Sequence, residues 1–203
     1  MKNKNLYFDF KNKKVVVLGS SGGIGKMIVK DFLEAGAEVV GISRSKINLS
    51  NKKFSQLNFD ITKITQNDLS HLLKNLNKVD FLINSFAISI KSNEKVQSYL
   101  DFEKTINNNI LSYFKIIIEI IEKMKINSSI VHITSINSKF AFEKNPGYQA
   151  SKSALSALTR SFAKDLSYKK IRVNSIAPSY IKTKMTEKSY KNKVKRSYIA
   201  KKS

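Results

Sequence analysis

Residues 15–32, VVVLGSSGGIGKMIVKDF, decide the fold, because a short β-branched run passes through a glycine-rich turn into a helical pattern. An apolar run of this length that ends at glycine is typical of a buried strand. After the turn, Ile24, Ile28 and Phe32 recur every fourth residue and mark one face of a helix that ends near Gly36. The stretch therefore predicts a strand, a glycine turn and a helix in succession.

The same alternation continues along the chain. Further strands are expected at residues 37–43, 54–60, 79–85, 128–135 and 171–177, and further helices at residues 65–77, 99–125 and 148–167. Strands that alternate with helices favour right-handed crossovers and a parallel sheet covered on both faces. No repeat or low-complexity linker interrupts the series, so residues 1–203 are predicted to form a single doubly wound α/β domain of about six strands. Ligands of such sheets bind beyond the carboxyl ends of the strands.

Composition restricts the class of protein. The chain of 203 residues has no cysteine, which excludes disulfides and thiolate metal sites and is compatible with a reducing cytosol. His132 has no second ligand nearby and is interpreted as a satisfied or partly exposed histidine, and His71 as a surface residue, so no metal is expected. The amino terminus lacks the apolar core of a signal peptide, and the most apolar run, residues 113–124, is too short and too charged to span a membrane. A soluble, cytoplasmic protein is expected.

The formal net charge of +22 raises the question of a polyanion partner. The lysines are scattered through the whole chain, which indicates a solvated basic surface rather than a binding patch. The exception is the stretch 182–203, where nine basic residues accompany the single acid Glu187. Nucleic acid is therefore the least favoured partner, and residues 186–203 are expected to form a basic tail.

Three glycines, Gly19, Gly23 and Gly25, lie between the first strand and the first helix. Glycine lets the backbone turn sharply and approach a pyrophosphate, which then lies against the amides at the positive end of the helix. A P-loop is excluded because five residues separate Gly19 from Gly25 and because Met27 follows Lys26. The turn predicts a dinucleotide site, with a purely structural turn as the alternative.

The second strand ends at Ser43 and Arg44, which bears on the choice of dinucleotide. An acidic residue here would favour NAD by accepting hydrogen bonds from the adenosine 2′-hydroxyl. Serine removes that preference, and the neighbouring arginine can pair with a 2′-phosphate. NADP is therefore favoured, with NAD as the alternative. Asp60, at the end of the third strand, either accepts from the adenine amino group or caps the next turn.

Tyr148 and Lys152 are four residues apart at the start of a predicted helix and so share one face. A free tyrosine has a pKa near ~10, and lowering it to about 7 requires roughly 4 kcal/mol of preferential stabilisation of the phenolate. The lysine ammonium supplies positive charge for this purpose. The pair therefore predicts a tyrosine of lowered pKa that acts as a general acid and base, with a chance pair on a solvated helix as the alternative.

In chain order, these features resemble the classical short-chain dehydrogenases/reductases. The resemblance covers roughly residues 10–186 and rests on the glycine turn, Asp60, Asn109, Ser135, Tyr148-x3-Lys152 and RVNSIAPSYIKT at 172–183. It implies a Rossmann-like fold and an NAD(P)(H)-dependent oxidoreductase that interconverts a carbonyl and a secondary alcohol. The chain is similar to the 3-oxoacyl-[acyl-carrier-protein] reductase type, which implies a small-molecule substrate, free or carrier-bound, and a homodimer or homotetramer.

The resemblance also implies residue roles. Ser135 would hydrogen-bond the substrate oxygen, and Tyr148 would transfer the proton as hydride moves to or from carbon. Lys152 would hold the nicotinamide ribose, and Asn109 would hold a water that links this lysine to solvent. The implied cofactor contacts are Gly19, Ser21, Gly23, Ile24, Gly25, Arg44, Asp60, Ile61, Asn84, Tyr148, Lys152, Pro178 and Thr183.

The sequence also departs from the family pattern. Leu18 precedes the glycine turn where the family has threonine, Ser179 follows Pro178 in place of glycine, and NSFA at 84–87 replaces Asn-Asn-Ala-Gly, so that Phe86 lies near the cofactor. Family members continue beyond this chain's end with a seventh strand, whose absence would make the sixth strand an edge. The missing end and the altered NSFA turn keep open a second hypothesis, a non-catalytic NADP-binding regulatory protein. The basic tail keeps open a third, less favoured one, a polyanion-binding protein.

Overall fold

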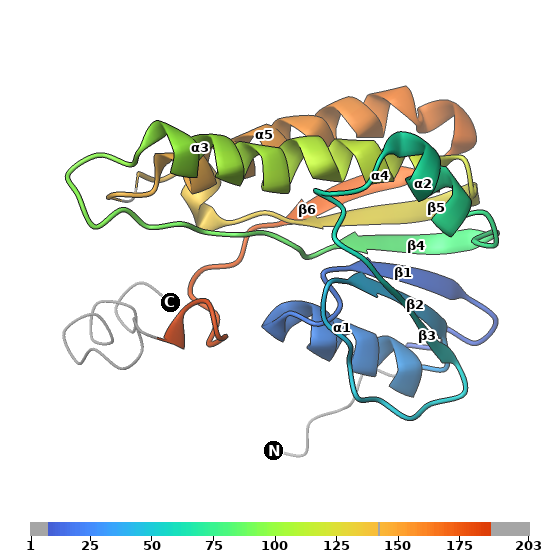
Figure 1. Cartoon of the computed structure of the whole chain (residues 1–203). Helices are drawn as coiled ribbons and strands as arrows, with labels where there is room; N and C mark the ends of the chain where they lie inside the picture. The colour runs from blue at the N-terminus through green and yellow to red at the C-terminus, as the bar shows by residue number, and fades with distance from the viewer. Residues whose placement is uncertain (1–7, 142, 188–203) are drawn as a thin grey trace, which may run out of the picture.

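The structure, a computed structural model, describes residues 8–141 and 143–187 of the chain. Six strands form one parallel sheet in the order β3-β2-β1-β4-β5-β6 (Figure 1). The strands are β1 (Lys14–Leu18), β2 (Glu38–Ser43), β3 (Phe54–Asn58), β4 (Val79–Asn84), β5 (Met124–Ile133) and β6 (Arg172–Ile176). The predicted doubly wound parallel sheet of six strands is confirmed, and its order reverses between β1 and β4, where such folds bind ligands.

Helices cover both faces of the sheet. Figure 1 shows α1 on one face and α3, α4 and α5 on the other. The helices are α1 (Gly23–Glu34), α2 (Gln66–Leu72), α3 (Tyr99–Ile106), α4 (Ser112–Ile121) and α5 (Pro146–Asp165), with short helical turns η1 (Asn107–Leu111), η2 (Ile136–Ser138) and η3 (Ser167–Lys169). Because all the strands are parallel, their carboxyl ends lie at one edge of the sheet, which the two helical layers leave open.

Strand β1 shows why the fold has two cores. Val15 and Val17 pack with α1 in one buried cluster, whereas Val16 and Leu18 pack with α2, α4 and α5 in the other. Successive side chains of a strand point to opposite faces, so a continuous apolar run is what a strand covered on both sides requires. Each of these side chains is at most 1% exposed, and burial of one such side chain contributes about 1.5–3 kcal/mol.

The buried face of α1 lies one residue further along the chain than the apolar pattern predicts. Ile24, Ile28 and Phe32 are only half-buried. A Cβ on residue 25 would lie 2.2 Å from the carbonyl oxygen of Gly19, so the helix contacts the turn where it has no side chain. The buried residues of α1 are Gly25, Val29 and Leu33. The apolar pattern misses this face because it does not count glycine as a core residue.

The helix predicted at 99–125 is shorter and interrupted. A π-helical turn, η1, separates α3 from α4, and β5 already begins at Met124. The chain leaves α4 through a turn in which Lys123 N donates to Ile120 O, and Met124 then pairs with Val79 in the sheet. By contrast, the helix predicted from residue 65 starts there, because Thr65 caps α2 with a reciprocal capping box.

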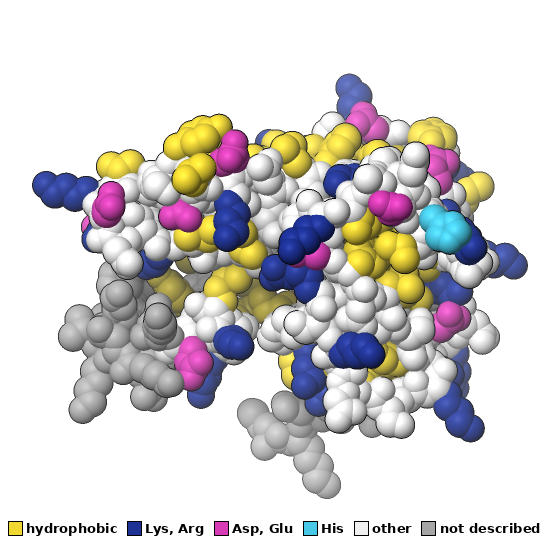
Figure 2. Space-filling model, in the orientation of Figure 1, with side chains coloured by type: hydrophobic (Ala, Val, Ile, Leu, Met, Phe, Trp, Pro, Cys, Tyr) yellow, Lys and Arg dark blue, Asp and Glu magenta, His cyan; other side chains and the backbone are white. Residues whose placement is uncertain are grey.

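The outer surface bears on two further expectations. Within the described part of the chain, β6 is the last strand on its side of the sheet, and only Val173 of its five residues is buried. Lysines and arginines are spread over the face seen in Figure 2, with acidic side chains among them. Among the described residues, no helix is both long and apolar enough to cross a membrane. The basic tail predicted at 186–203 lies almost wholly outside the described residues.

Candidate active site

A cavity of about 490 Å³ lies at the carboxyl edge of the sheet. The glycine turn after β1 and the ends of β2, β4 and β5 line it, together with the start of α5 and the segment that follows β6. Of the residues predicted from the sequence, the cavity brings together Gly19, Ser21, Gly23, Ile24, Arg44, Asp60, Ile61, Ser135, Tyr148, Lys152, Pro178 and Thr183. Gly25, Asn84 and Asn109 do not line it.

A positive φ angle and close contacts explain why glycine stands at these positions of the turn after β1. Gly19 has a φ of 77°, and a Cβ on it would lie 2.7 Å from backbone atoms of Phe86. Gly25 allows the first turn of α1 to approach Gly19, as described above. Gly23 has a different contact, since its Cβ would lie 2.8 Å from Thr183 Cγ2. Two of the three glycines are thus required by the fold itself, while the third borders the cavity and the segment after β6.

Charged residues lie at the end of the cavity formed by β2 and β3. Arg44 Nη1 is 4.0 Å from a carboxylate oxygen of Asp60, and the arginine side chain is 62% exposed. Burial on its own would raise the pKa of Asp60, but hydrogen bonds from Thr62 and the charges of Arg44 and Lys63 bring that pKa below its ordinary value. Asp60 therefore does cap the next turn, through Thr62 N at 3.1 Å and Oγ1 at 2.8 Å, and it also faces the cavity.

Ser135 and Tyr148 meet at the opposite end of the cavity. Ser135 follows β5, and Tyr148 lies in the first turn of α5, which begins at Pro146. Burial raises the pKa of Tyr148 above its ordinary value and outweighs the interaction with the Ser135 hydroxyl, which acts to lower it. The predicted lowering of this pKa is therefore not found in the protein without cofactor, and for the protein with bound cofactor it stays a prediction.

Lys152 is buried beside Tyr148 on the same helix face. Its side chain is 3% exposed, and Nζ donates a 2.7 Å hydrogen bond to the carbonyl oxygen of Ile133. The ammonium lies 5.6 Å from the centroid of the Tyr148 ring. Burial also lowers the pKa of Lys152 to about 8. The lysine shares a helix face with the tyrosine as predicted, but its ammonium donates to the end of β5.

Asn109 lies in the π-helical turn η1 and forms hydrogen bonds to the backbone of Ile88, in the segment that follows β4. Its Oδ1 accepts from Ile88 N at 2.8 Å, and its Nδ2 donates to Ile88 O at 2.9 Å and to Ser151 Oγ at 3.0 Å. Both amide hydrogens are therefore used within the protein. π-Helical turns are frequent at functional sites. The side chain braces the segment after β4 against α5, and it is the neighbouring Asn108 that lines the cavity.

A buried polar group lies beneath the cavity. His132 is fully buried, which fits the satisfied histidine expected, and it is hydrogen-bonded to Tyr113 and, through Nδ1 at 2.7 Å, to Thr159 Oγ1. The threonine hydroxyl donates to Leu155 O, so Nδ1 carries the proton and Nε2 accepts from Tyr113. Burial and the charge of Lys152 lower the pKa of His132 to about 4 and keep it neutral. His71 is exposed, as expected.

Comparison with known proteins agrees with this arrangement. The family model for short chain dehydrogenases matches residues 13–194. The chain belongs to the short-chain dehydrogenase family.

Individual family members are similar over most of their length. The 3-oxoacyl-[acyl-carrier-protein] reductase FabG of Chlamydia pneumoniae is 33% identical over 188 residues, which are 86% of this chain and 75% of that protein. The 2-dehydro-3-deoxy-D-gluconate 5-dehydrogenase of Bacillus subtilis is 29% identical over 195 residues, 89% of this chain and 75% of that protein. The Pseudomonas aeruginosa RhlG/NADP active-site complex has a TM-score of 0.79 at 25% identity and covers 93% of this chain and 80% of its own.

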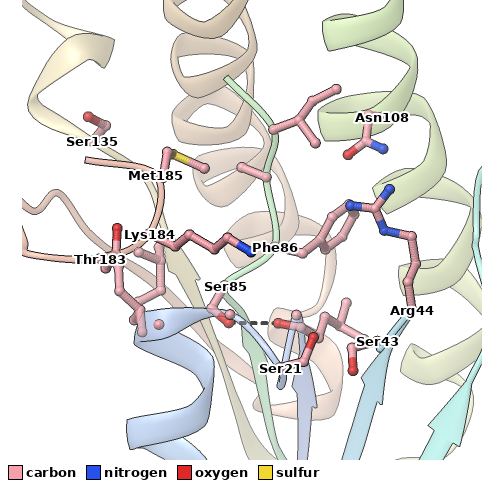
Figure 3. Close-up of a pocket in the computed structure, with 18 of the residues that line it drawn as sticks. Ser21, Ser43, Arg44, Ser85, Phe86, Asn108, Ser135, Thr183, Lys184 and Met185 are labelled. Carbon is pink, nitrogen blue, oxygen red and sulfur yellow. Dashed lines mark hydrogen bonds between the residues drawn. The ribbon is translucent and has the colours of Figure 1, made fainter. Parts of the chain in front are cut away.

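Several residues of the site were not predicted from the sequence. Ser45, Ile88, Asn108, Lys184 and Met185 all line the cavity. Figure 3 shows Arg44 and Lys184 reaching into it from opposite sides. The position of Lys184 directly after Thr183 was a usable signal, but one charge within a lysine-rich stretch does not stand out.

Proposed function

We propose that the chain is an NADP-preferring oxidoreductase that interconverts a carbonyl and a secondary alcohol, with Tyr148 as general acid and base. The observation that carries this proposal is that Ser135, Tyr148 and Lys152, which are far from the glycine turn in sequence, line the same cavity as that turn. A proton donor and a dinucleotide cradle in one cavity are what a hydride-transfer reaction needs.

The cavity suits a dinucleotide. Gly23, at the start of α1, lines it, and this helix has no acidic residue in its first turn and no side-chain cap. Its lining carries the cations Arg44, Lys152 and Lys184 against the single acid Asp60. The similar structure of Pseudomonas aeruginosa RhlG is a complex with NADP. In our proposal Arg44 holds the 2′-phosphate, Lys152 the nicotinamide ribose, and the segment of Pro178 and Thr183 the nicotinamide end.

The acid–base step follows from the pair at the other end of the cavity. When bound, NADPH supplies the hydride that reduces the carbonyl carbon. Ser135 and Tyr148 donate hydrogen bonds to the carbonyl oxygen, and Tyr148 passes its proton to that oxygen as the alcohol forms. Burial keeps the phenol protonated at neutral pH, which is the form needed for reduction. Lys152 supplies positive charge beside the phenolate that remains.

The substrate class is taken from the relatives. The Chlamydia relative is named for reduction of a 3-oxoacyl group on an acyl carrier protein, and the Bacillus relative for oxidation of a sugar acid. The higher identity to the first favours a 3-oxoacyl thioester for this chain. The basic surface of the chain suits an acidic carrier.

The test uses purified full-length protein and two matched variants. Oxidation of NADPH is followed with a 3-oxoacyl thioester and with a panel of sugar-acid and simple ketones. Tyr148→Phe is expected to lower kcat/KM by about a hundredfold or more while NADPH still binds. Tyr168→Phe removes the hydroxyl of an exposed tyrosine outside the cavity and is expected to change neither. Equal activity of the Tyr148→Phe protein would contradict the proposed role of this residue.

A non-catalytic nucleotide-binding protein is the second candidate. It is favoured by Phe86, whose ring lies within the cavity lining, with its centroid 6.3 Å from that of the Tyr113 ring. This candidate predicts NADPH binding without turnover of any substrate in the panel. The assay therefore distinguishes the two functions, because it follows both the binding and the oxidation of NADPH.

A further inference from the structure

The turn that follows β6 carries a lysine into the cavity. Lys184 lines it, and Figure 3 shows the extended side chain crossing the cavity toward Phe86 from the side opposite Arg44. The ion pairs formed by the described residues do not include Lys184. Its ammonium is therefore available to an anionic group inside the cavity.

The turn itself is fixed against the start of α1. Thr183 packs against Gly23. A Cβ on residue 23 would lie only 2.8 Å from the methyl carbon Cγ2 of Thr183. Thr183 N donates to Thr186 Oγ1 at 3.0 Å, and that hydroxyl donates to Ile181 O at 2.6 Å. The backbone of Lys184 is consequently held beside the glycine turn, so only the side chain has to adjust when an anion binds.

The two cations that flank the middle of the cavity suit different groups. Arg44 follows β2, near Asp60 and far from the catalytic tyrosine, where our proposal places the 2′-phosphate. Lys184 lies beside the glycine turn, between that end and the end formed by Ser135 and Tyr148. A lysine ammonium is a compact point charge that binds phosphate oxygens without the paired geometry of a guanidinium.

Resting on the dinucleotide-binding function proposed above, we propose that Lys184 binds the pyrophosphate of the cofactor. The pyrophosphate is common to NADPH and NADH, whereas the 2′-phosphate belongs to NADPH alone. Lys184 therefore contributes affinity for both dinucleotides, and Arg44 provides the preference between them. This division of roles is what the experiment tests.

The experiment measures dissociation constants of NADPH and NADH by fluorescence titration of the full chain at low salt. Lys184→Ala is expected to raise both constants by the same factor, about five- to twentyfold, since a charge-assisted hydrogen bond is lost. Lys184→Arg keeps the charge and is expected to recover most of the affinity. Lys182→Ala removes an exposed lysine from the same segment that does not line the cavity, and it is expected to bind as the wild type does.

A third probe separates the two phosphates. The nucleotide 2′-AMP carries a 2′-phosphate but no pyrophosphate, and it is expected to bind Lys184→Ala and wild type equally. Unchanged or tighter dinucleotide binding by Lys184→Ala would overturn the proposal, and so would a loss confined to NADPH and 2′-AMP. Wild-type protein that binds neither dinucleotide would instead overturn the proposed function, and the role of Lys184 with it.

Discussion

Lys152 donates a 2.7 Å hydrogen bond to the carbonyl oxygen of Ile133, the last residue of β5. The ammonium is thereby hydrogen-bonded to the carboxyl end of β5. The same helix, α5, also places Tyr148 in the lining of the cavity. A buried ammonium costs free energy in its charged form, which is why burial lowers the pKa of this lysine to about 8. The lysine that lines the cavity is thus also a buried charged group whose burial costs free energy.

This burial predicts a specific dependence of stability on pH. Between pH 8 and 10.5 the native lysine has released its proton, while the unfolded chain, with the ordinary pKa of 10.5, still binds it. More protons are bound in the unfolded state, so the free energy of unfolding rises with pH across this window, by about 3 kcal/mol at most. Guanidinium unfolding at pH 7 and pH 10 is expected to show wild type gaining stability relative to Lys152→Met. A constant difference would contradict the burial of a charged Lys152, and Lys182→Met serves as the exposed control.

The second prediction concerns ionisation of the phenol in the protein without cofactor. Because burial raises the pKa of Tyr148 above the ordinary value of 10.0, no phenolate is expected at this position between pH 6 and 9. Ultraviolet titration of wild type and of Tyr148→Phe should therefore coincide over that range. An extra ionisation near pH 7 that is present only in wild type would show that Lys152 activates the phenol before any cofactor binds.

The architecture and most of the cavity were predictable from the sequence for identifiable physical reasons. A run such as Val15–Leu18, apolar at every position, can only be a strand covered on both faces. In a parallel sheet all carboxyl ends share one edge, so Arg44, Ser135 and Pro178, each just beyond a strand, were expected along the same edge. Tyr148 and Lys152 followed from the helical period.

What the sequence missed depends on contacts between distant segments. The π-helical turn at Asn107–Leu111 leaves the apolar repeat nearly intact, so its signal was absent. The Lys152 ammonium is directed by its hydrogen bond to the carbonyl oxygen of Ile133. The spacing of residues along a helix does not predict such a contact. Lys184 enters the cavity only because Thr183 packs on Gly23. For both lysines the deciding contact joins segments that are separated in the chain.

The third prediction tests the choice of cofactor. Arg44→Ala is expected to raise the dissociation constant of NADPH about tenfold and to leave that of NADH nearly unchanged, because only the 2′-phosphate loses its partner. The ion pair with Asp60 spans 4.0 Å and is largely exposed, so its loss should change the free energy of unfolding by less than about 1 kcal/mol. Parallel fluorescence titrations check this, and an equal loss for both dinucleotides would show that Arg44 does not read the 2′-phosphate.

The fourth prediction compares two adjacent asparagines. Asn109→Ala removes hydrogen bonds to both backbone groups of Ile88 and to Ser151, which leaves buried polar groups without partners. This change is expected to lower the free energy of unfolding by about 2–4 kcal/mol. Asn108→Ala, whose side chain faces the cavity, should cost less than about 1 kcal/mol. Chemical denaturation measures both, and equal losses would mean that the bracing described for Asn109 contributes little.

The fifth prediction separates two glycines of the same turn. A Cβ at residue 25 would lie 2.2 Å from Gly19 O and 2.7 Å from Ser85 Oγ, so Gly25→Ala must displace α1 from the turn. A loss of about 1–3 kcal/mol in the free energy of unfolding is expected, together with weaker NADPH binding. Gly22 has a φ of −71°, and its Cβ would meet only Gly19 O, at 3.2 Å. Gly22→Ala is therefore expected to stay within about 1 kcal/mol of wild type, because the lower entropy of its unfolded chain offsets the tight contact. If both substitutions proved equally harmless, the close approach of α1 to the turn would not be what requires glycine at residue 25.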